Sequence, residues 1–132
     1  MYVDNDYNLL PLSMQVSFKG NFLGQHKGII TTDTPSQHGQ SIDVHNGKLG
    51  VEVQNGFYSS DIEVSNDTWY NATAVFTDGN VKLYIDGVLE ASRTSAIGYF
   101  NETVTPIFST RNNNSTSNGS YFHVGYCEAW NG

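Results

Sequence analysis

Short runs in which apolar and polar residues alternate recur along the chain. In "LSMQVSFKG" (12–20), Met14, Val16 and Phe18 fall on one side, and polar residues lie between them. This period of two predicts a strand with one buried face, because successive side chains of a strand point to opposite faces. No window of a dozen residues carries apolar residues at spacings of three and four, so the sequence predicts an all-β protein.

Turn residues divide these runs into hairpins. In "SIDVHNGKLGVEV" (41–53), Asn46-Gly47 separates two alternating stretches. Asn-Gly is the pair that a type I′ turn favours, because both central residues of that turn have positive φ. We therefore predict a hairpin here, followed by a turn at "QNGF" (54–57) and a strand that includes "DIEV" (61–64).

The stretch "WYNATAVFTDGNVKLYIDGVLEAS" (69–92) predicts a three-stranded meander. Strands over 70–77 and 81–85 and a short strand at 88–89 are separated by two turns that contain Asp-Gly. A last strand is predicted at "YFHVGYCEAW" (121–130). Many short strands with a turn signal about every 8–12 residues predict a two-sheet antiparallel sandwich. No linker interrupts the pattern, so residues 1–132 are expected to form a single domain.

The 69–92 stretch closely resembles the signature of laminin-G-like domains in the concanavalin A-like lectin/glucanase superfamily. The residues that carry the resemblance are Trp69, Ala74, Val75, Thr77, Asp78, Gly79, Val81, Leu83, Tyr84, Ile85, Asp86, Gly87 and Leu89. Looser agreement covers most of the remaining chain. The resemblance implies a jelly roll of the concanavalin A type, with Trp69 as a core residue that anchors the meander against the opposite sheet.

The same resemblance implies a strand before "YV" and another after "AWNG" (129–132), so the first or last strand of the jelly roll is expected to be missing or shortened. Three explanations stay open at this point. The chain is a piece of a longer protein, "YFHVGYCEAW" is itself the final strand, or a neighbouring subunit donates one. An unpaired sheet edge is a template for another strand, so self-association through edge strands is one expectation.

Charge and composition exclude several classes of protein. Six Lys and Arg against 13 Asp and Glu give a formal charge of −7, and the basic residues are scattered. A nucleic-acid binder needs clustered cations to neutralise phosphates, so that class is excluded. No apolar run of about 18 residues is present, so membrane insertion is not expected. Cys127 is the only cysteine, which leaves neither an internal disulfide nor a thiolate zinc cluster.

Six Asn-x-Ser/Thr motifs suggest an extracellular or surface-displayed protein. They lie at Asn66, Asn71, Asn101, Asn113, Asn114 and Asn118. Two readings stay open, because an Asn- and Ser-rich loop produces such motifs by composition alone, whereas a secreted protein uses them as glycosylation sites. The first ten residues lack the basic and apolar regions of a secretion signal.

The residues needed for glucanase catalysis are not found. The resemblance implies that enzymes of this superfamily place carboxylates two apart on one strand, and a retaining mechanism needs a pair about 5–5.5 Å apart. Asp61 and Glu63 have the spacing but lack a third carboxylate, and a solvent-facing role explains them. The four histidines lie in different segments, so no Ser-His-Asp group is indicated. We predict that the protein is not an enzyme.

Two kinds of binding site remain. Calcium prefers carboxylate, amide and carbonyl oxygens, and "DND" at Asp4, Asn5 and Asp6 is the densest group of such ligands. Sugar sites combine aromatic rings with amide hydrogen-bonding groups. The candidates are two aromatic pairs expected in loops, Phe57 with Tyr58 and Tyr99 with Phe100, which could act as ligand platforms, together with Trp130 and Asn131. The sequence and the resemblance together predict a non-catalytic module that recognises glycans or glycoproteins. The alternative is a structural subunit of an extracellular or virion fibre assembled through strand donation.

Overall fold

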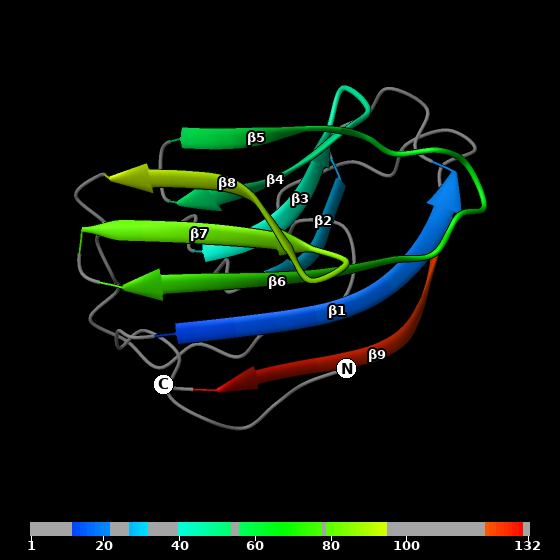
Figure 1. Ribbon diagram of the computed structural model, residues 1–132. Helices are drawn as coiled ribbons and strands as arrows, with labels where there is room; N and C mark the ends of the chain where they lie inside the picture. Colours follow the sequence, from blue (N-terminus) through cyan, green and yellow to red (C-terminus); the bar gives the residue numbers. More distant parts are fainter. Residues whose placement is uncertain are drawn as a thin grey trace, which may run out of the picture.

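The computed structural model describes residues 12–21, 27–31, 40–53, 56–77, 79–94 and 121–130. All regular structure in these ranges is β-strand, as predicted (Figure 1). The strands are β1 (Leu12–Asn21), β2 (Lys27–Thr31), β3 (Gln40–His45), β4 (Lys48–Val53), β5 (Gly56–Glu63), β6 (Tyr70–Thr77), β7 (Asn80–Ile85), β8 (Val88–Thr94) and β9 (Tyr121–Trp130).

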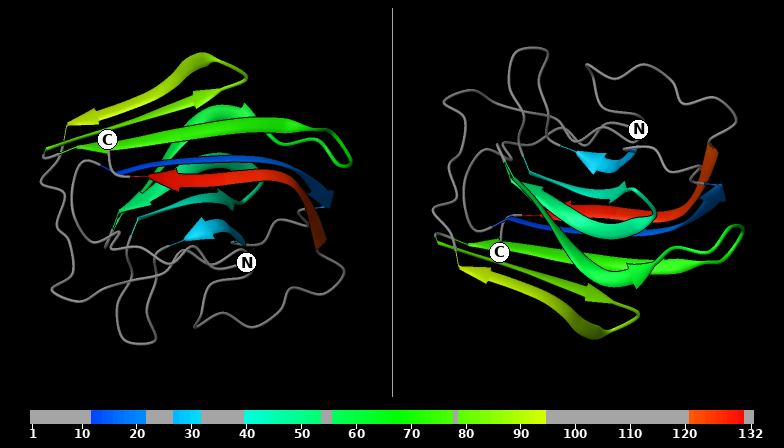
Figure 2. Two further views of the ribbon diagram at one scale, coloured as in Figure 1. Left: turned by 90° about the horizontal axis from the view of Figure 1, so that it is seen from below. Right: turned by 90° about the horizontal axis from the view of Figure 1, so that it is seen from above.

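The strands form two antiparallel sheets stacked face to face (Figure 2). One sheet has five strands in the order β8-β7-β6-β1-β9, and the other has four in the order β2-β3-β4-β5. Figure 1 looks onto the five-stranded sheet, with the four-stranded sheet behind it. We call the side of each sheet that is turned away from the other sheet its outer face. The predicted two-sheet sandwich is confirmed.

The core lies between the sheets and follows the predicted alternation. Met14, Val16 and Phe18 of β1 have no exposed surface, and neither do Ile42 and Val44 of β3. Burying such side chains contributes about 1.5–3 kcal/mol each, which makes this layer the main source of stability. The full set of buried apolar residues is Leu12, Met14, Val16, Phe18, Ile29, Ile30, Ile42, Val44, Leu49, Val51, Val53, Ala72, Ala74, Phe76, Val81, Leu83, Ile85 and Ala129.

Two of the predicted tight turns form hairpins with a positive-φ pair, whereas Asp78 of the third predicted turn lies outside the described residues. Asn46 and Gly47 have φ of 51° and 80°, and Asp86 and Gly87 have φ of 50° and 81°. Two consecutive residues of positive φ are what a type I′ turn requires. Asp86 also ties its turn to the neighbouring strand, since its carboxylate accepts a hydrogen bond from the backbone N–H of Asn71 at 2.9 Å.

The first and last described strands are neighbours in the sheet. β1 pairs with β6 on one side and with β9 on the other, so the predicted strand at 121–130 exists. The expectation of a missing or shortened terminal strand depends on residues 1–11 and 131–132. These residues lie outside the described part of the chain.

The outer faces of the two sheets differ in burial. On β1, Gln15, Ser17 and Lys19 are half-exposed between buried neighbours, as expected for a strand with one solvated face. On the central strands of the four-stranded sheet the polar positions are buried as well: Ser41 is 2% exposed and Asp43 is 0% exposed. Among the described residues, the more open outer face is therefore that of the five-stranded sheet.

Candidate functional site

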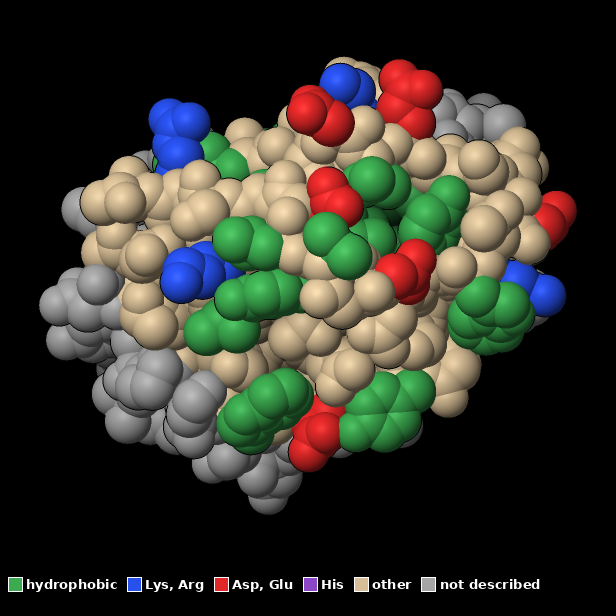
Figure 3. All heavy atoms as spheres, in the orientation of Figure 1, with side chains coloured by type: hydrophobic (Ala, Val, Ile, Leu, Met, Phe, Trp, Pro, Cys, Tyr) green, Lys and Arg blue, Asp and Glu red, His purple; other side chains and the backbone are tan. Residues whose placement is uncertain are grey.

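Aromatic side chains gather on the outer face of the five-stranded sheet, along the edge that β9 forms. The antiparallel register aligns Trp130 with Ser13 and Tyr126 with Ser17. Directly paired residues share a face, and these two serines alternate with the core residues of β1. Trp130, Glu128 and Tyr126 therefore point outward. In Figure 3, green apolar and aromatic side chains with red acidic ones among them lie along the lower margin, over β9.

The structure corrects the position predicted for Trp69. Its side chain is 51% exposed, and the residue precedes β6 instead of packing between the sheets. The next residue takes the inner position, because the Tyr70 ring lies 5.9 Å from the ring of Phe18, centroid to centroid. The Tyr70 hydroxyl also accepts a hydrogen bond from the backbone N–H of Ser65 at 2.8 Å. Alternation along the extended chain then sends Trp69 to the outer side.

Trp69 lies across β1 and β9. A register shift at the Ser17–Phe18 step leaves Gly125 as an extra residue on β9. A Cβ atom added to Gly125 would lie 3.1 Å from two atoms of the Trp69 ring, so the ring covers this glycine. The Nζ atom of Lys19 lies 5.3 Å from the centroid of the same ring, within the range of a cation–π contact.

We call Trp69, Tyr126 and Trp130 the aromatic row. Tyr126 is 48% exposed, and Trp130 is half-buried. Tyr126 and Trp130 are four positions apart along β9, which corresponds to about 13 Å at the usual strand rise. The Tyr126 hydroxyl donates a hydrogen bond of 2.5 Å to a carboxylate oxygen of Glu128. This hydrogen bond raises the pKa of Tyr126 above its ordinary value and fixes its ring beside Glu128.

Amide and hydroxyl groups lie beside the row on the same face. The Nε2 of Gln15 donates to Oδ1 of Asn71 at 3.2 Å, and the Nδ2 of Asn71 donates to the Ser17 hydroxyl at 2.9 Å. These contacts link β1 and β6 through their outer side chains. The site thus combines aromatic rings on β9 with fixed polar groups on β1 and β6, which suits a ligand that is both flat and rich in hydroxyl groups.

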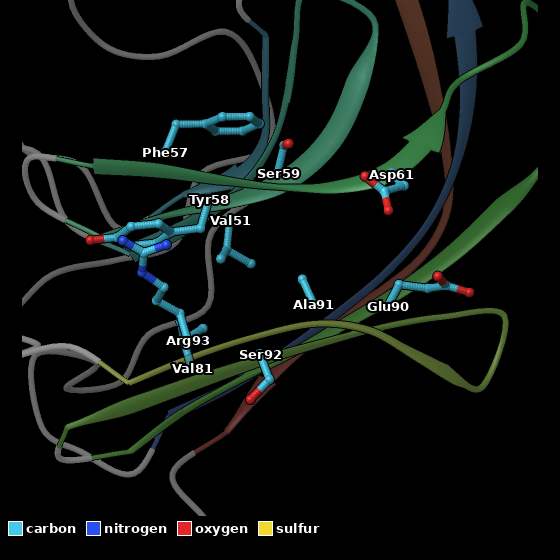
Figure 4. A pocket seen from close by; sticks show the side chains of 10 residues that line it. All are labelled: Val51, Phe57, Tyr58, Ser59, Asp61, Val81, Glu90, Ala91, Ser92 and Arg93. Atoms are coloured by element: carbon cyan, nitrogen blue, oxygen red, sulfur yellow. The ribbon is translucent and has the colours of Figure 1, made fainter.

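A second feature is a groove of about 470 Å³ between β5 and β8, which we call the edge groove (Figure 4). Each of these strands is the last of its sheet. At one end the guanidinium carbon of Arg93 lies 4.7 Å from the ring centroid of Tyr58. Asp61 and Glu90 lie at the other end.

Phe57 and Tyr58 do not form a joint platform in a loop, which corrects the sequence-based expectation. Both belong to β5 and point to opposite sides of it. The Phe57 ring lies directly over Gly50, since a Cβ atom added to Gly50 would be 2.6 Å from the tip of the ring. The ring also contacts the His45 ring edge to face, with 5.1 Å between the two centroids. The Phe57 ring therefore packs on the outer face of the four-stranded sheet, whereas the Tyr58 ring lies at the end of the edge groove beside Arg93; both residues contribute to the groove lining.

A sequence profile described as the concanavalin A-like lectin/glucanases superfamily matches residues 12–128. The chain belongs to this superfamily. The match confirms the resemblance seen in the 69–92 stretch and covers all nine described strands almost completely. Comparison with curated protein sequences gives no match.

Solved structures share the fold of this superfamily member at low sequence identity. The receptor-binding domain of botulinum neurotoxin type G aligns with a TM-score of 0.68 and 14% identity over 91% of this chain and 34% of that chain. A heptameric SAP-like pentraxin from Limulus polyphemus aligns with a TM-score of 0.65 and 17% identity, over 91% of this chain and 63% of the pentraxin chain. A Trypanosoma rangeli sialidase aligns with a TM-score of 0.68 and 8% identity, over 91% of this chain and 20% of the sialidase chain. The chain spans about a fifth to two thirds of the length of these proteins.

The fold of the superfamily does not by itself decide between binding and catalysis, since these similar structures include a receptor-binding domain, a pentraxin and a sialidase. The carboxylate spacing considered for catalysis is present on β5. Asp61 and Glu63 are both exposed there, as predicted for a solvent-facing strand. A third carboxylate in line with them is absent from β5.

Several predicted site residues lie outside the described residues. They are the sugar-site candidates Tyr99, Phe100 and Asn131, the calcium candidates Asp4, Asn5 and Asp6, and the sequons at Asn101, Asn113, Asn114 and Asn118. Within the described ranges, no three His, Cys, Asp or Glu side chains are grouped as metal ligands. The described part of the chain also contains no helix of the length and hydropathy needed to cross a membrane.

The two described sequons differ in their surroundings. Asn66 is exposed in the turn before β6, where the Thr68 hydroxyl donates to the Asn66 carbonyl at 3.3 Å. Asn71 is half-buried within β6, and its side-chain amide is hydrogen-bonded to Gln15 and Ser17. Glycosylation remains a prediction for both, and Asn66 has the freer side chain.

The sequence reasoning found Trp130 but missed Tyr126 and misplaced Trp69. A signal for Tyr126 was present, because the alternation of 121–130 puts Tyr126, Glu128 and Trp130 on one side of the strand. The side opposite to them carries Cys127 and Ala129, which are the more buried residues. The position of Trp69 over Gly125 carries no such signal, because it depends on a contact between distant segments.

Proposed function

We propose that this domain is a non-catalytic recognition module that binds glycans along the aromatic row. The observation that carries the proposal is the line of Trp69, Tyr126 and Trp130 on the open outer face of the five-stranded sheet. Large aromatic side chains that gather on a surface mark interaction sites. The C–H faces of sugar rings stack on such side chains, so an extended glycan would follow the direction of β9.

Two features support a row that is in place before the ligand arrives. The hydrogen bond to Glu128 orients Tyr126, and Trp69 rests on Gly125 beside Lys19. Side chains that are already ordered lose less conformational entropy on binding. Sugar hydroxyls would find donors and acceptors in the Gln15 amide and the Glu128 carboxylate, which are aligned across β1 and β9.

Glycan-array binding followed by calorimetric titration of the best ligand tests this proposal. We expect Trp130→Ala and Tyr126→Ala each to weaken binding by about tenfold, because losing an aromatic contact at the centre of an interface costs on the order of 1–2 kcal/mol. Val88→Ala is the control, since Val88 is 57% exposed on β8 at the opposite edge of the sheet. A double variant at 126 and 130 that melts like the wild type and binds the glycan equally well would refute the proposal.

Two additions to the same experiment test the remaining expectations. Running the array with calcium and then with chelator tests calcium as a cofactor held at Asp4, Asn5 and Asp6, and selective loss of binding in chelator would support it. Incubating the domain with the bound glycan tests for catalysis. Release of reducing sugar would contradict a purely recognising role. We propose an extracellular or surface location, with glycans or glycoproteins as partners, and the exposed sequon at Asn66 is in keeping with it.

A second candidate function is assembly through an edge strand, which the surface of β8 favours. Val88 and Leu89 are exposed on this strand, which is the last of its sheet. Exposed apolar residues on an edge strand promote pairing with another chain. Size measurement at micromolar concentration separates the two functions. A self-associating domain that Val88→Lys turns into a monomer would favour assembly, whereas a monomeric wild type would exclude it.

A further inference from the structure

Two strands, β5 and β8, border the edge groove. Each of them has a β-bulge, and each bulge contains a residue with a carboxylate side chain. In the ladder between β7 and β8, Leu83 pairs with Ala91. The next residue, Tyr84, pairs with Leu89, so Glu90 is one extra residue on β8. Regular pairing would place Glu90 opposite Tyr84 on the outer face. The bulge instead brings it to the lining of the groove, which is a known use of bulges at sheet edges.

β5 is bulged in the corresponding place. Between two successive pairs of the β4–β5 ladder, β4 advances by two residues and β5 by four. The Ser60 hydroxyl holds this bulge, because it donates to the Leu49 carbonyl at 2.6 Å and accepts from the backbone N–H of Ile62 at 3.1 Å. Asp61 lies between these two residues and lines the edge groove.

The two bulges leave a pair of carboxylates at one end of the groove, where no described residue supplies a matching positive charge. Figure 4 shows Asp61 on β5 and Glu90 on β8 at the same end. Neither carboxylate has a hydrogen-bond or ion-pair partner among the described residues. Arg93 lies at the opposite end, stacked over the Tyr58 ring. The groove therefore has a negative end and a positive end.

We propose that the edge groove is a second binding site, which takes the primary ammonium group of an amino sugar between Asp61 and Glu90. An ammonium carries three N–H donors, enough to reach both carboxylates at once. The sugar ring would lie over the apolar floor made by Val51 and Val81, with the Arg93–Tyr58 contact limiting the length of the ligand. A volume of about 470 Å³ is within the range of sites for small ligands.

An ammonium fits this groove better than a metal ion does. Calcium requires six to eight oxygen ligands, and no three metal-ligating side chains are grouped within the described ranges. An organic cation needs fewer acceptors and brings apolar surface to the floor of the groove. The formal charge of −7 adds a long-range attraction for cationic ligands.

The test compares two ligands that differ only in the amino group. We would titrate the domain with the β-1,4-linked glucosamine trimer and with its fully N-acetylated counterpart. We expect the free amine to bind more tightly than the acetylated trimer, because acetylation removes the charge. Asp61→Asn and Glu90→Gln should each weaken binding of the amine by about tenfold, the loss expected for one charge-assisted hydrogen bond.

Glu63→Gln is the matched control, because Glu63 is an exposed acid on the same strand outside the groove lining. It should leave the affinity unchanged, and repeating the titration with the Trp130→Ala protein separates binding in the groove from binding at the aromatic row. Equal binding of both trimers, or unchanged affinity in a folded variant with both Asp61→Asn and Glu90→Gln, would overturn the proposal. Binding of Nα-acetyl-lysinamide without binding of the glucosamine trimer would overturn the assignment to a sugar. Failure of neutral glycans to bind the row would leave this outcome unaffected.

Discussion

The outer faces of the two sheets come from similar alternating sequences and have opposite surroundings. On the five-stranded sheet, Gln15, Ser17 and Lys19 of β1 point outward and are half-exposed, and the aromatic row lies beside them. On the four-stranded sheet, Ser41, Asp43 and Glu52 point outward and are all buried. The comparison teaches that, among the described residues, the outer face of the five-stranded sheet is the more accessible to a ligand, whereas changes at the buried polar positions of the other sheet are expected to act on stability.

The sharpest test of this comparison places the same charge on each outer face. Thr31, on β2, is fully buried, whereas Thr73, on β6, is half-exposed. We expect Thr31→Lys to lower the free energy of unfolding by about 3 kcal/mol or more, because a buried charge without a partner is costly. Thr73→Lys should change it by less than about 1 kcal/mol. Urea denaturation measures both, and equal losses would mean that the two faces are equally covered.

Two glycines allow a second test of the same contrast, of smaller size. A Cβ on Gly50 would lie 2.5 Å from the backbone oxygen of Tyr58 and 2.8 Å from the Cα of Ser59, so Gly50→Ala must move backbone. We expect it to cost about 2–3 kcal/mol, as overpacking does. At Gly125 the close contact of the added methyl group is with the exposed Trp69 ring, at 3.1 Å, while the backbone oxygen of Ser17 lies 4.0 Å away.

Gly125→Ala should therefore cost less than about 1 kcal/mol while displacing Trp69, because a surface ring can move aside. Thermal melting gives the stability of both variants, and the tryptophan emission spectrum reports on the ring. A Gly125→Ala protein as unstable as Gly50→Ala would show that Trp69 is held as firmly as a core residue.

The two type I′ turns provide a control in which the sheets should behave alike. Gly47 belongs to the four-stranded sheet and Gly87 to the five-stranded sheet, with φ of 80° and 81°. Space around both is open, so only backbone strain opposes a side chain. Replacing either glycine by alanine should cost about 1 kcal/mol. A clear difference between the two variants in denaturant titration would mean that the surroundings of the turns matter.

The smallest expected effect is the pH dependence of stability that Tyr126 contributes on the outer face of the five-stranded sheet. The hydrogen bond to Glu128 raises the pKa of Tyr126, so the phenol stays protonated above the pH at which an ordinary tyrosine ionises. Its contribution to stability is present below the unfolded pKa and is lost as the pH rises through the raised folded value. Glu128→Gln should bring the pKa of Tyr126 down. Ultraviolet titration measures this change in the pKa of Tyr126. The Tyr126→Phe variant identifies the signal of Tyr126 among those of the eight tyrosines. An unchanged titration would mean that Glu128 does not hold the phenol in solution.

Local sequence rules were sufficient where a structural feature depends on neighbouring residues. The Asn46-Gly47 hairpin and the strand over 70–77 form as predicted, because turn conformation and strand periodicity are set within a few residues. The inward side of β1 was equally predictable, since a face of Met14, Val16 and Phe18 can be buried in only one way.

The candidate site was predictable only in part. Trp130 was recognised as an aromatic beside a polar residue, but Phe57 and Tyr58 were assigned to a loop although they lie in β5. Asp61 and Glu90 are far apart in sequence, and two bulges bring them to one end of the edge groove. A bulge arises from the fit between two strands, so the sequence of one strand does not reveal it.

By itself, the sequence determined the class of the protein. Period-two alternation and positive-φ turns specify antiparallel strands, and the 69–92 signature points to the superfamily, because both are encoded by residues close to one another. Only the tertiary structure decided which of the described faces is more open, where Trp69 lies and which carboxylates line the same groove. Those features depend on contacts between strands that are distant in sequence, and burial is a property of the assembled sheets.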